Sequence, residues 1–320
     1  MEKYNDGIGG YMSKVYFSSA RMKKLNASES LPKKLPKLLE EAGIGEIVEK
    51  GNIVAIKIHF GDLEGGGFRY VRPIFARAVS DVVKEHGGIP FFTDTWGLKH
   101  VLAAIRNGFN YTTLGAPILP ANGIKENFFY TVKLYKYFHL QEVDVAGNIY
   151  DADVLINLSH VKGHPSSGMG GAIKNIAMGC TSYKIRGEVH KLERNDNDGR
   201  TFQEAMIDVV KAVLRNKVKK HIHINAILDV QPMCDCAPFS DLPIVPDIGI
   251  AVSRDPIAVE KFSLDAIDQA PPMPMSLAEK LGLKSGDNKF FKIHGKNPYH
   301  QVYAGVKANL GSDKYEVIEI

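Results

Sequence analysis

The sequence has few cysteines, a single tryptophan and no long apolar run. Of its 320 residues, three are cysteine and one is tryptophan. An odd number of cysteines does not suit the paired disulfides that small secreted domains use. No apolar run approaches the ~18 residues of a membrane helix, and residues 1–11 hold no apolar segment of a signal peptide. We therefore expect a cytoplasmic protein without a membrane partner.

A strong surplus of one charge is lacking too. Forty Lys and Arg stand against 36 Asp and Glu, a net charge of +4, far from the surplus of a dedicated nucleic-acid binder. The densest basic stretch, residues 211–220, ends a helical segment, where cations complement the helix dipole. We interpret it as a solvated helix end and do not expect nucleic-acid binding. A patch for RNA is the alternative.

Strand and helix patterns alternate along most of the chain. Apolar, β-branched segments at residues 53–60, 89–92 and 154–158 predict strands, and residues 73–87 predict an amphipathic helix. Strands separated by helices indicate βαβ units, so we predict an α/β fold: a mostly parallel, Rossmann-like sheet flanked by helices. The domain should cover residues 12–320, with residues 1–11 as a flexible extension. Two lobes that meet near residue 150 are the alternative arrangement.

Two segments carry more local predictions. Residues 128–138 are aromatic and alternating, which favours antiparallel strands or a lid. Thr201 to Glu204 has the pattern of a capping box and predicts the start of a helix. His221 and His223 share one face of a predicted strand, and we interpret them as surface residues.

Polar side chains collect where the predicted strands end. In parallel α/β sheets, ligands bind beyond the carboxyl ends of the strands. The repetition of such residues over several strand ends predicts a shared site for a small anionic ligand, although a structural role is the alternative for any one of them. The predicted catalytic residues are His59, Asp62, Asp94, His160, Lys162 and His164.

A glycine-rich turn precedes the predicted helix at residues 172–178. Glycines between a strand and a helix leave backbone N–H groups free to face an anion, and the helix dipole favours negative charge. The turn is neither a dinucleotide fingerprint nor a Walker loop, and a tight turn that needs positive φ is the alternative. The predicted ligand-binding residues are Lys57, Gly168, Gly170, Gly171, Lys174 and Asn175.

The cysteines form the third signal. Cys234 and Cys236 are separated by one residue, a spacing that lets two thiolates bind one soft metal, with Cys180 as a third ligand. We predict that the three come together on Zn or Fe; three separate buried thiols are the alternative. His59, His160, His164 or His190 would complete the ligand set. No cysteine run of the ferredoxin type is present, so an iron–sulphur cluster is not expected.

Four motifs resemble one family. They are Ile58-His59-Phe60-Gly61-Asp62, Ser159-His160-Val161-Lys162-Gly163-His164, Gly170-Gly171-Ala172-Ile173-Lys174-Asn175 and Cys234-Asp235-Cys236. With further matches over roughly residues 14–268, they are similar to the domain-of-unknown-function family numbered 362, whose members are commonly called uncharacterised iron–sulphur centre proteins. The glycine turn after the histidine-rich loop is also similar to the lactate racemase family, which uses a nickel cofactor.

The family resemblance implies a redox partner. Many members carry a ferredoxin-like insertion that would follow His190, whereas residues 191–200 here are short, polar and free of cysteine. Two hypotheses follow. The chain is a metal- or redox-associated enzyme that acts on a small anionic ligand, or a non-catalytic ligand- or partner-binding module that works with a separate ferredoxin.

Overall fold

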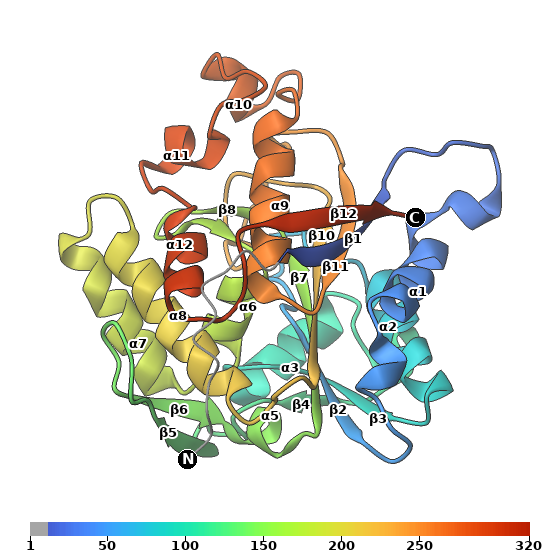
Figure 1. Cartoon of the computed structure of the whole chain (residues 1–320), viewed down its shortest axis with the longest axis vertical. Coiled ribbons are helices and arrows are strands. Elements are labelled where there is room, and N and C mark those ends of the chain that lie inside the picture. Colours follow the sequence, from blue (N-terminus) through green and yellow to red (C-terminus); the bar gives the residue numbers. More distant parts are fainter. Residues whose placement is uncertain (1–11) are drawn as a thin grey trace.

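One eight-stranded sheet organises the computed structural model, which describes residues 12–320 (Figure 1). Its strands are β1 (Ser13–Ser19), β2 (Ile53–Ile58), β3 (Ile89–Asp94), β4 (Ile118–Pro120), β7 (Val154–His160), β10 (His221–Ile227), β11 (Gly249–Ser253) and β12 (Tyr315–Glu319). They lie in the order β12-β1-β11-β10-β7-β2-β3-β4. β11 is antiparallel to β1 and β10, and every other neighbouring pair is parallel. The predicted mostly parallel α/β fold is confirmed. The predicted flexible extension lies outside the described residues.

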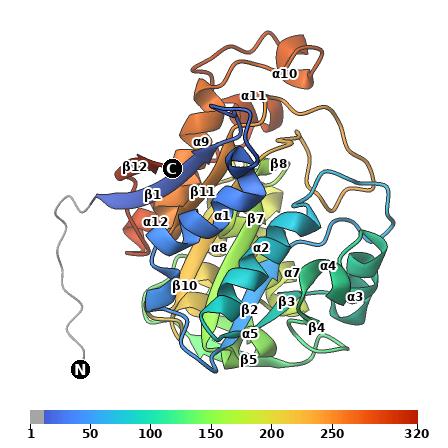
Figure 2. The same ribbon diagram turned by 90° about the vertical axis from the view of Figure 1, so that its right-hand side faces the viewer.

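Helices cover both faces of this sheet (Figure 2). α1 (Leu31–Glu41) and α2 (Pro73–Glu85) pack on one face, where their apolar stripes join side chains of β2, β7 and β10. α6 (Ala172–Gly179), α8 (Arg200–Leu214) and α9 (Pro256–Gln269) pack on the other. The shorter helices are α3 (Gly97–Arg106), α4 (Tyr111–Leu114), α5 (Gly147–Asp151), α7 (Tyr183–Lys191), α10 (Leu277–Lys280), α11 (Lys289–His294) and α12 (His300–Lys307). The 3-10 turns are η1 (Ala27–Glu29), η2 (Ile44–Glu46) and η3 (Leu192–Asn195).

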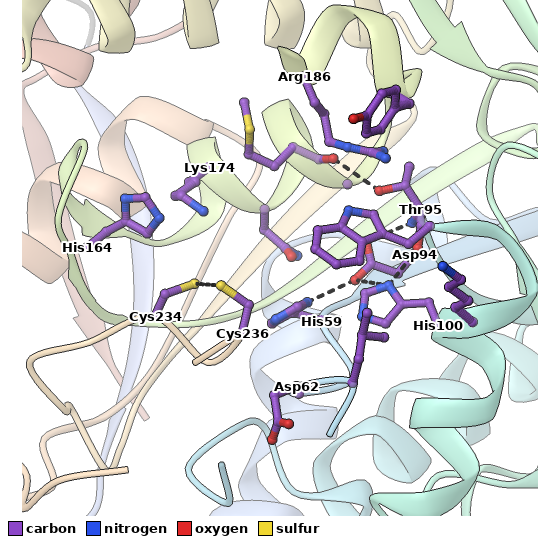
Figure 3. A pocket seen from close by; sticks show the side chains of 18 of the residues that line it. His59, Asp62, Asp94, Thr95, His100, His164, Lys174, Arg186, Cys234 and Cys236 are labelled. Atoms are coloured by element: carbon purple, nitrogen blue, oxygen red, sulfur yellow. Dashed lines mark hydrogen bonds and ion pairs between the residues drawn. The ribbon is translucent and has the colours of Figure 1, made fainter. Parts of the chain in front are cut away.

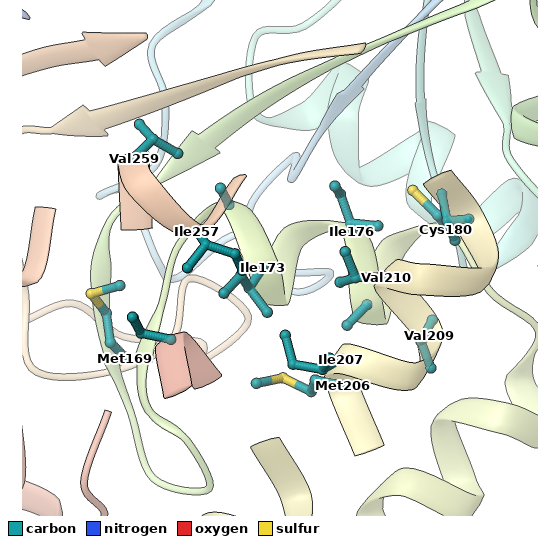
Figure 4. Close-up of a cluster of buried hydrophobic side chains, with 14 of the residues drawn as sticks. Met169, Ile173, Ile176, Cys180, Met206, Ile207, Val209, Val210, Ile257 and Val259 are labelled. Atoms are coloured by element: carbon teal, nitrogen blue, oxygen red, sulfur yellow. The ribbon is translucent and has the colours of Figure 1, made fainter. Parts of the chain in front are cut away.

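The α6 face holds the larger apolar cluster (Figure 4). Ile173 and Ile176 of α6 meet Met206 and Val210 of α8, all fully buried. Burial of side chains this size removes apolar surface from water at roughly 25 cal/mol per Å². This packing fixes α6, and therefore the glycine turn that precedes it, against the sheet.

Two small hairpins flank the main sheet. β5 (Phe129–Lys133) pairs antiparallel with β6 (Glu142–Ala146), so the antiparallel prediction holds for residues 129–133, while residues 134–138 form no strand. β8 (Lys162–His164) pairs with β9 (Gly168–Gly170) directly before α6. Residue 150 falls in α5, and strands from both sides of it share the one sheet.

The start of α8 differs from the predicted capping box. The helix begins at Arg200, after Gly199 in the left-handed conformation at φ 82°. The backbone N–H of Phe202 donates to Asp196 Oδ2 at 2.9 Å, so Asp196 from the preceding turn, and not Thr201, satisfies an amide of the first helical turn. Within residues 12–320, no helix is long and apolar enough to cross a membrane.

Candidate functional site

A cavity of about 680 Å³ opens beside the carboxyl ends of β2, β3 and β7 (Figure 3). Its lining includes Lys57, His59, Asp62, Asp94, His100, Lys162, His164, Lys174, Asn175, Arg186, Cys234 and Cys236. The volume is that of a site for a small molecule. Most of the predicted site residues lie in this one cavity. They were predicted from the rule that ligand sites follow parallel strands, whose carboxyl ends share one edge of the sheet.

His59 and Asp94 form the most complete catalytic arrangement in this cavity. His59 Nδ1 lies 3.0 Å from Asp94 Oδ2, while His59 Nε2 is buried and has no hydrogen-bond partner among the described residues. Burial alone would raise the pKa of Asp94, but the charge of Lys57 at 3.1 Å and the hydrogen bond from His59 hold that pKa far below its usual value. Ionised Asp94 accepts the Nδ1–H of His59, which leaves a lone pair on Nε2.

His100 completes a cluster that the sequence interpretation missed. Its Nδ1 donates to the backbone oxygen of Thr95 at 2.6 Å and lies 3.3 Å from Asp94 Oδ2. Ligand atoms of His59, Asp94 and His100 all lie within 4.8 Å of one another, so the three could hold a metal ion. Hydropathy did not indicate His100, because this polar residue lies on the buried face of α3 while the apolar Leu102 of the same helix is exposed.

Asp235 organises a second group, deeper in the wall. It accepts from His160 Nδ1 at 2.8 Å and pairs with Lys162 Nζ at 3.0 Å. Although burial lowers the pKa of Lys162, the charge of Asp235 outweighs it and the pKa is raised. His160 Nε2 donates to the backbone oxygen of Leu228 at 2.7 Å. His160 does not line the cavity and has both nitrogens engaged, so the structure does not place it where the predicted catalytic role requires.

Asp62 lines the cavity but serves its own loop. Its carboxylate accepts the backbone N–H groups of Glu64, Gly65 and Gly67 at 2.6–2.7 Å. Burial would raise the pKa of Asp62, and these hydrogen bonds reverse that shift and lower it. These hydrogen bonds close the glycine loop after β2, and the catalytic role of Asp62 stays a prediction.

The glycine turn before α6 contains a buried carboxylate where an anionic ligand was predicted. Glu260 Oε2 accepts the backbone N–H of Ala172 at 2.7 Å, and a Cβ on Gly171 would lie 2.5 Å from that oxygen. Gly168 adopts φ +73°, the conformation that the alternative interpretation required. Because Glu260 occupies the helix N-terminus, Gly168, Gly170 and Gly171 shape the turn and do not line the cavity.

The cysteines separate into a pair and a single thiol. Cys234 and Cys236 line the cavity with their sulfurs 2.9 Å apart. Cys180 is fully buried in the apolar cluster beneath α6 and lines no part of this cavity. Burial raises the pKa of Cys180 to about 12. Among residues 12–320, the three sulfurs do not form a group of ligands within 4.8 Å, so the predicted three-cysteine metal site is wrong.

An iron–sulphur cluster of the four-thiolate type does not fit this donor set. Such clusters are held by four thiolates, or by two thiolates and two imidazoles in the Rieske type. The chain has three cysteines, and the apolar packing of α6 withholds Cys180 from the pair. The inherited description as an iron–sulphur protein is therefore not supported by the residues present.

A line of buried polar side chains runs from the cavity across the sheet. Lys57 donates to Asn175 Oδ1 at 2.7 Å, and Asn175 Nδ2 donates to Asn157 Oδ1 at 2.7 Å. Asn157 Nδ2 then lies 3.2 Å from His223 Nδ1, and His223 Nε2 lies 2.9 Å from His221 Nδ1. Burial lowers the pKa of both histidines, that of His221 to about 4. The interpretation as a surface residue is wrong for His223, which is fully buried because β10 lies inside the sheet, whereas His221 at the start of the strand is partly buried.

Three cations of the cavity are already paired, whereas two of its lysines, the exposed Lys99 and the half-buried Lys174, form no ion pair in the part of the chain described. Lys57 pairs with Asp94, Lys162 with Asp235, and Arg186 with Glu126 at 2.6 Å. Lys174 is half-buried on α6 and, within the part of the chain described, makes no hydrogen bond or ion pair. Its charge is therefore free to attract an anion that enters the cavity.

Comparison with known proteins identifies the family. The model of the family described as Domain of unknown function (DUF362) matches residues 54–265. The chain belongs to the DUF362 family. The match runs from within β2 to α9 and includes β3, β7, β10 and β11, and so covers the strands that end at the cavity.

Individual relatives of this DUF362 protein are distant. A thylakoid-associated protein from Synechocystis sp. is 29% identical over 191 residues, which cover 58% of this chain and 56% of that one. The lactate racemase apoprotein from Thermoanaerobacterium thermosaccharolyticum is 15% identical, with a TM-score of 0.44 over 67% of this chain and 51% of that one. A structural-genomics protein from Thermotoga maritima is 12% identical, with a TM-score of 0.38 over 62% and 50%. The chain thus spans about half the length of these proteins.

Proposed function

We propose that this DUF362 protein is an enzyme that acts on a small anionic substrate, with His59 as the group that accepts and returns a proton. The observation that carries the proposal is the His59–Asp94 pair: Nδ1 is held by a carboxylate at 3.0 Å, and Nε2 has no partner. An imidazole oriented in this way is the most frequent general base in enzymes, and proton transfer of this kind contributes about 10²–10⁴-fold to rate.

The charge of the substrate is inferred from Lys174. A half-buried ammonium group without an ion pair favours an anion beside it, because the surroundings screen charge less than bulk water does. His164 and Lys162 line the same wall. Burial, together with the positive charge of Lys174, lowers the pKa of His164 to about 4, so at neutral pH the cations of this wall are the two lysines. A carboxylate or phosphate group suits this environment.

Proton transfer can be tested before the substrate is known. Mixtures of small carboxylates and phosphate esters are incubated with the protein in D₂O, and loss of proton signals is followed by NMR. We expect exchange at one compound, slowed by at least about 100-fold in His59→Gln. His86→Gln is the matched control, since His86 pairs with Glu40 outside the cavity lining. Exchange that persists unchanged in His59→Gln would contradict the proposal.

The anion site is tested separately by binding. Titration of inorganic phosphate and of oxalate is followed by NMR shifts of cavity residues. Lys174→Met should weaken binding by about 10-fold, or ~1.4 kcal/mol. Lys37→Met, on the exposed side of α1, should leave it unchanged. Equal affinities for both variants would show that Lys174 does not hold the anion.

A metal-assisted enzyme is the second candidate. It is favoured by the His59, Asp94 and His100 cluster, whose nitrogen and carboxylate donors suit Zn or Fe(II). A divalent ion there would polarise a bound anionic group as a Lewis acid. Titration with Co²⁺ distinguishes the candidates, since ligand-field bands that disappear in both Asp94→Asn and His100→Gln would indicate a metal site. The absence of such bands would leave proton transfer by His59 alone.

Two further parts of the proposal concern the surroundings of the enzyme. A cytoplasmic location is supported by the three free cysteines. The separate ferredoxin partner stays a prediction, and so does the non-catalytic alternative that depends on it.

A further inference from the structure

The sulfur atoms of Cys234 and Cys236 lie close together in the cavity wall. Their sulfurs lie 2.9 Å apart, about 0.9 Å beyond the length of a disulfide bond. Both line the cavity, with Cys234 6% exposed and Cys236 exposed at its mouth. A small movement of either side chain would bring the sulfurs to bonding distance, and the cavity gives a small molecule access to them.

The surroundings of Cys234 favour a thiolate. Figure 3 shows the sulfur of Cys234 facing that of Cys236, with His164 and Lys174 nearby. The hydrogen bond from Cys236 lowers the pKa of Cys234 far more than burial raises it, and the charge of Lys174 lowers it further. The same hydrogen bond raises the pKa of Cys236, which keeps the proton. One thiolate beside one thiol is the arrangement in which thiol–disulfide exchange proceeds rapidly.

Cys180 provides an internal contrast. It lies a few residues from Lys174 along α6, but packs entirely among apolar side chains. Its burial, with no cation paired to it, keeps it protonated. Only the cavity pair therefore combines access, proximity and a stabilising charge.

We propose that Cys234 and Cys236 are a redox-active dithiol that closes to a disulfide in exchange with a small-molecule disulfide. The Cys234 thiolate attacks one sulfur of the small disulfide, forms a mixed disulfide and releases a thiolate, which takes up a proton. Cys236 then loses its proton and attacks the Cys234 sulfur, which releases the second small thiol. In all, two protein thiols become one disulfide, and one small disulfide becomes two thiols, a transfer of two electrons. This activity goes beyond proton transfer at His59 and does not depend on it.

Redox titration of the full chain tests the closure. The protein is equilibrated in mixtures of oxidised and reduced dithiothreitol with EDTA present, its free thiols are alkylated, and its intact mass is measured. We expect Cys234 and Cys236 to lose reactivity together, so that the oxidised protein carries two alkyl groups fewer per monomer, with a two-electron dependence on the dithiothreitol ratio. Cys180→Ala should behave in the same way. Three alkylated cysteines in every mixture, or oxidation only to dimers between chains, would overturn the proposal.

Single variants test the order of attack. With cystamine as the small disulfide, Cys236→Ser should accumulate a mixed disulfide at Cys234, because the second thiol is missing. With iodoacetamide at pH 7, wild-type Cys234 should react about 10-fold faster than Cys236, since the thiolate is the reactive form. Equal rates for the two residues, or an adduct only on Cys236 in the wild-type protein, would contradict Cys234 as the attacking thiol. Should Cys236→Ser fail to fold, the wild-type rates alone decide this point.

Discussion

Lys57 shows how much of the site depends on single buried charges. Its side chain is 1% exposed, and its ammonium group is balanced by Asp94 at 3.1 Å and held by Asn175 at 2.7 Å. A buried ion is costly unless it is paired and hydrogen-bonded. Asp94 therefore has two roles, because it neutralises Lys57 and also orients His59.

Removal of the Asp94 charge should destabilise the protein as well as the site. We expect Asp94→Asn to lower the free energy of unfolding by about 3–5 kcal/mol, because it leaves Lys57 buried without a counter-charge. The measurement is urea denaturation at pH 7. The double variant Lys57→Met, Asp94→Asn should recover part of the loss, and costs that simply add would argue against coupling of the two residues.

At the scale of single residues, the sequence predicted identities better than roles. His59, Asp94, Lys162, His164 and Lys174 do line the cavity. The hydrogen-bond partners of His160 and Asp62 could not be predicted. His160 is held by the Asp235 carboxylate 75 residues away, and Asp62 accepts backbone amides of its own loop. Such partners follow from tertiary packing, which local spacing does not encode.

At the scale of elements, α6 links the sheet to the cavity. Its N-terminus is closed by Glu260 from α9, and its C-terminus passes directly over Lys57. The sequence predicted the helix and the glycine turn correctly, but the turn was interpreted as free for a ligand. Glu260 could not be assigned to it in advance, because α9 begins more than 80 residues further along the chain.

Two glycines in neighbouring helices should respond oppositely to alanine. A Cβ on Gly179 of α6 would overlap the Lys57 side chain, whereas one on Gly187 of α7 would meet nothing within 4 Å. We expect Gly179→Ala to destabilise by about 1–3 kcal/mol and Gly187→Ala to stabilise by about 0.5–1 kcal/mol. Urea denaturation of the two variants checks this. A stabilised Gly179→Ala protein would mean that α6 does not approach Lys57 so closely.

The Glu260 contact predicts a pH dependence of stability. Burial raises the pKa of Glu260 from 4.5 to about 7, so the folded state binds its proton more tightly than the unfolded state does. This contribution to stability is complete below about pH 4.5 and is lost as the pH rises through 7. Relative to Glu260→Gln, the wild-type free energy of unfolding should therefore fall by about 3 kcal/mol between pH 4.5 and pH 8. A constant difference over that range would contradict the raised pKa.

At the scale of the whole molecule, the sheet is most protected at its centre. β7 lies between β10 and β2 with all seven residues buried, whereas most of β5 is exposed. The alternation of strands and helices was sufficient to predict this parallel centre. It could not predict that β11 runs antiparallel, because direction depends on which neighbours a strand meets.

The rate of backbone amide hydrogen exchange should differ between the buried strand β7 and the exposed strand β5. Backbone amides of β7 should exchange only through global unfolding, while those of β5 should exchange much faster through local opening. Mass spectrometry of peptides from the two strands provides the measurement. Similar protection of β5 and β7 would indicate that the hairpin is held by contacts that the exposed surface of β5 does not suggest.

The polar line from Lys57 to His221 has a consequence for how this sequence can vary. Each side chain donates to the next in one direction, from Lys57 through Asn175, Asn157 and His223. Exchange of any one member leaves a buried neighbour unsatisfied, at a cost of about 1–3 kcal/mol. A single substitution at any of these positions should therefore be selected against. Over generations we expect its members to be inherited together or replaced together, so that five positions between Lys57 and His223 behave as one heritable character.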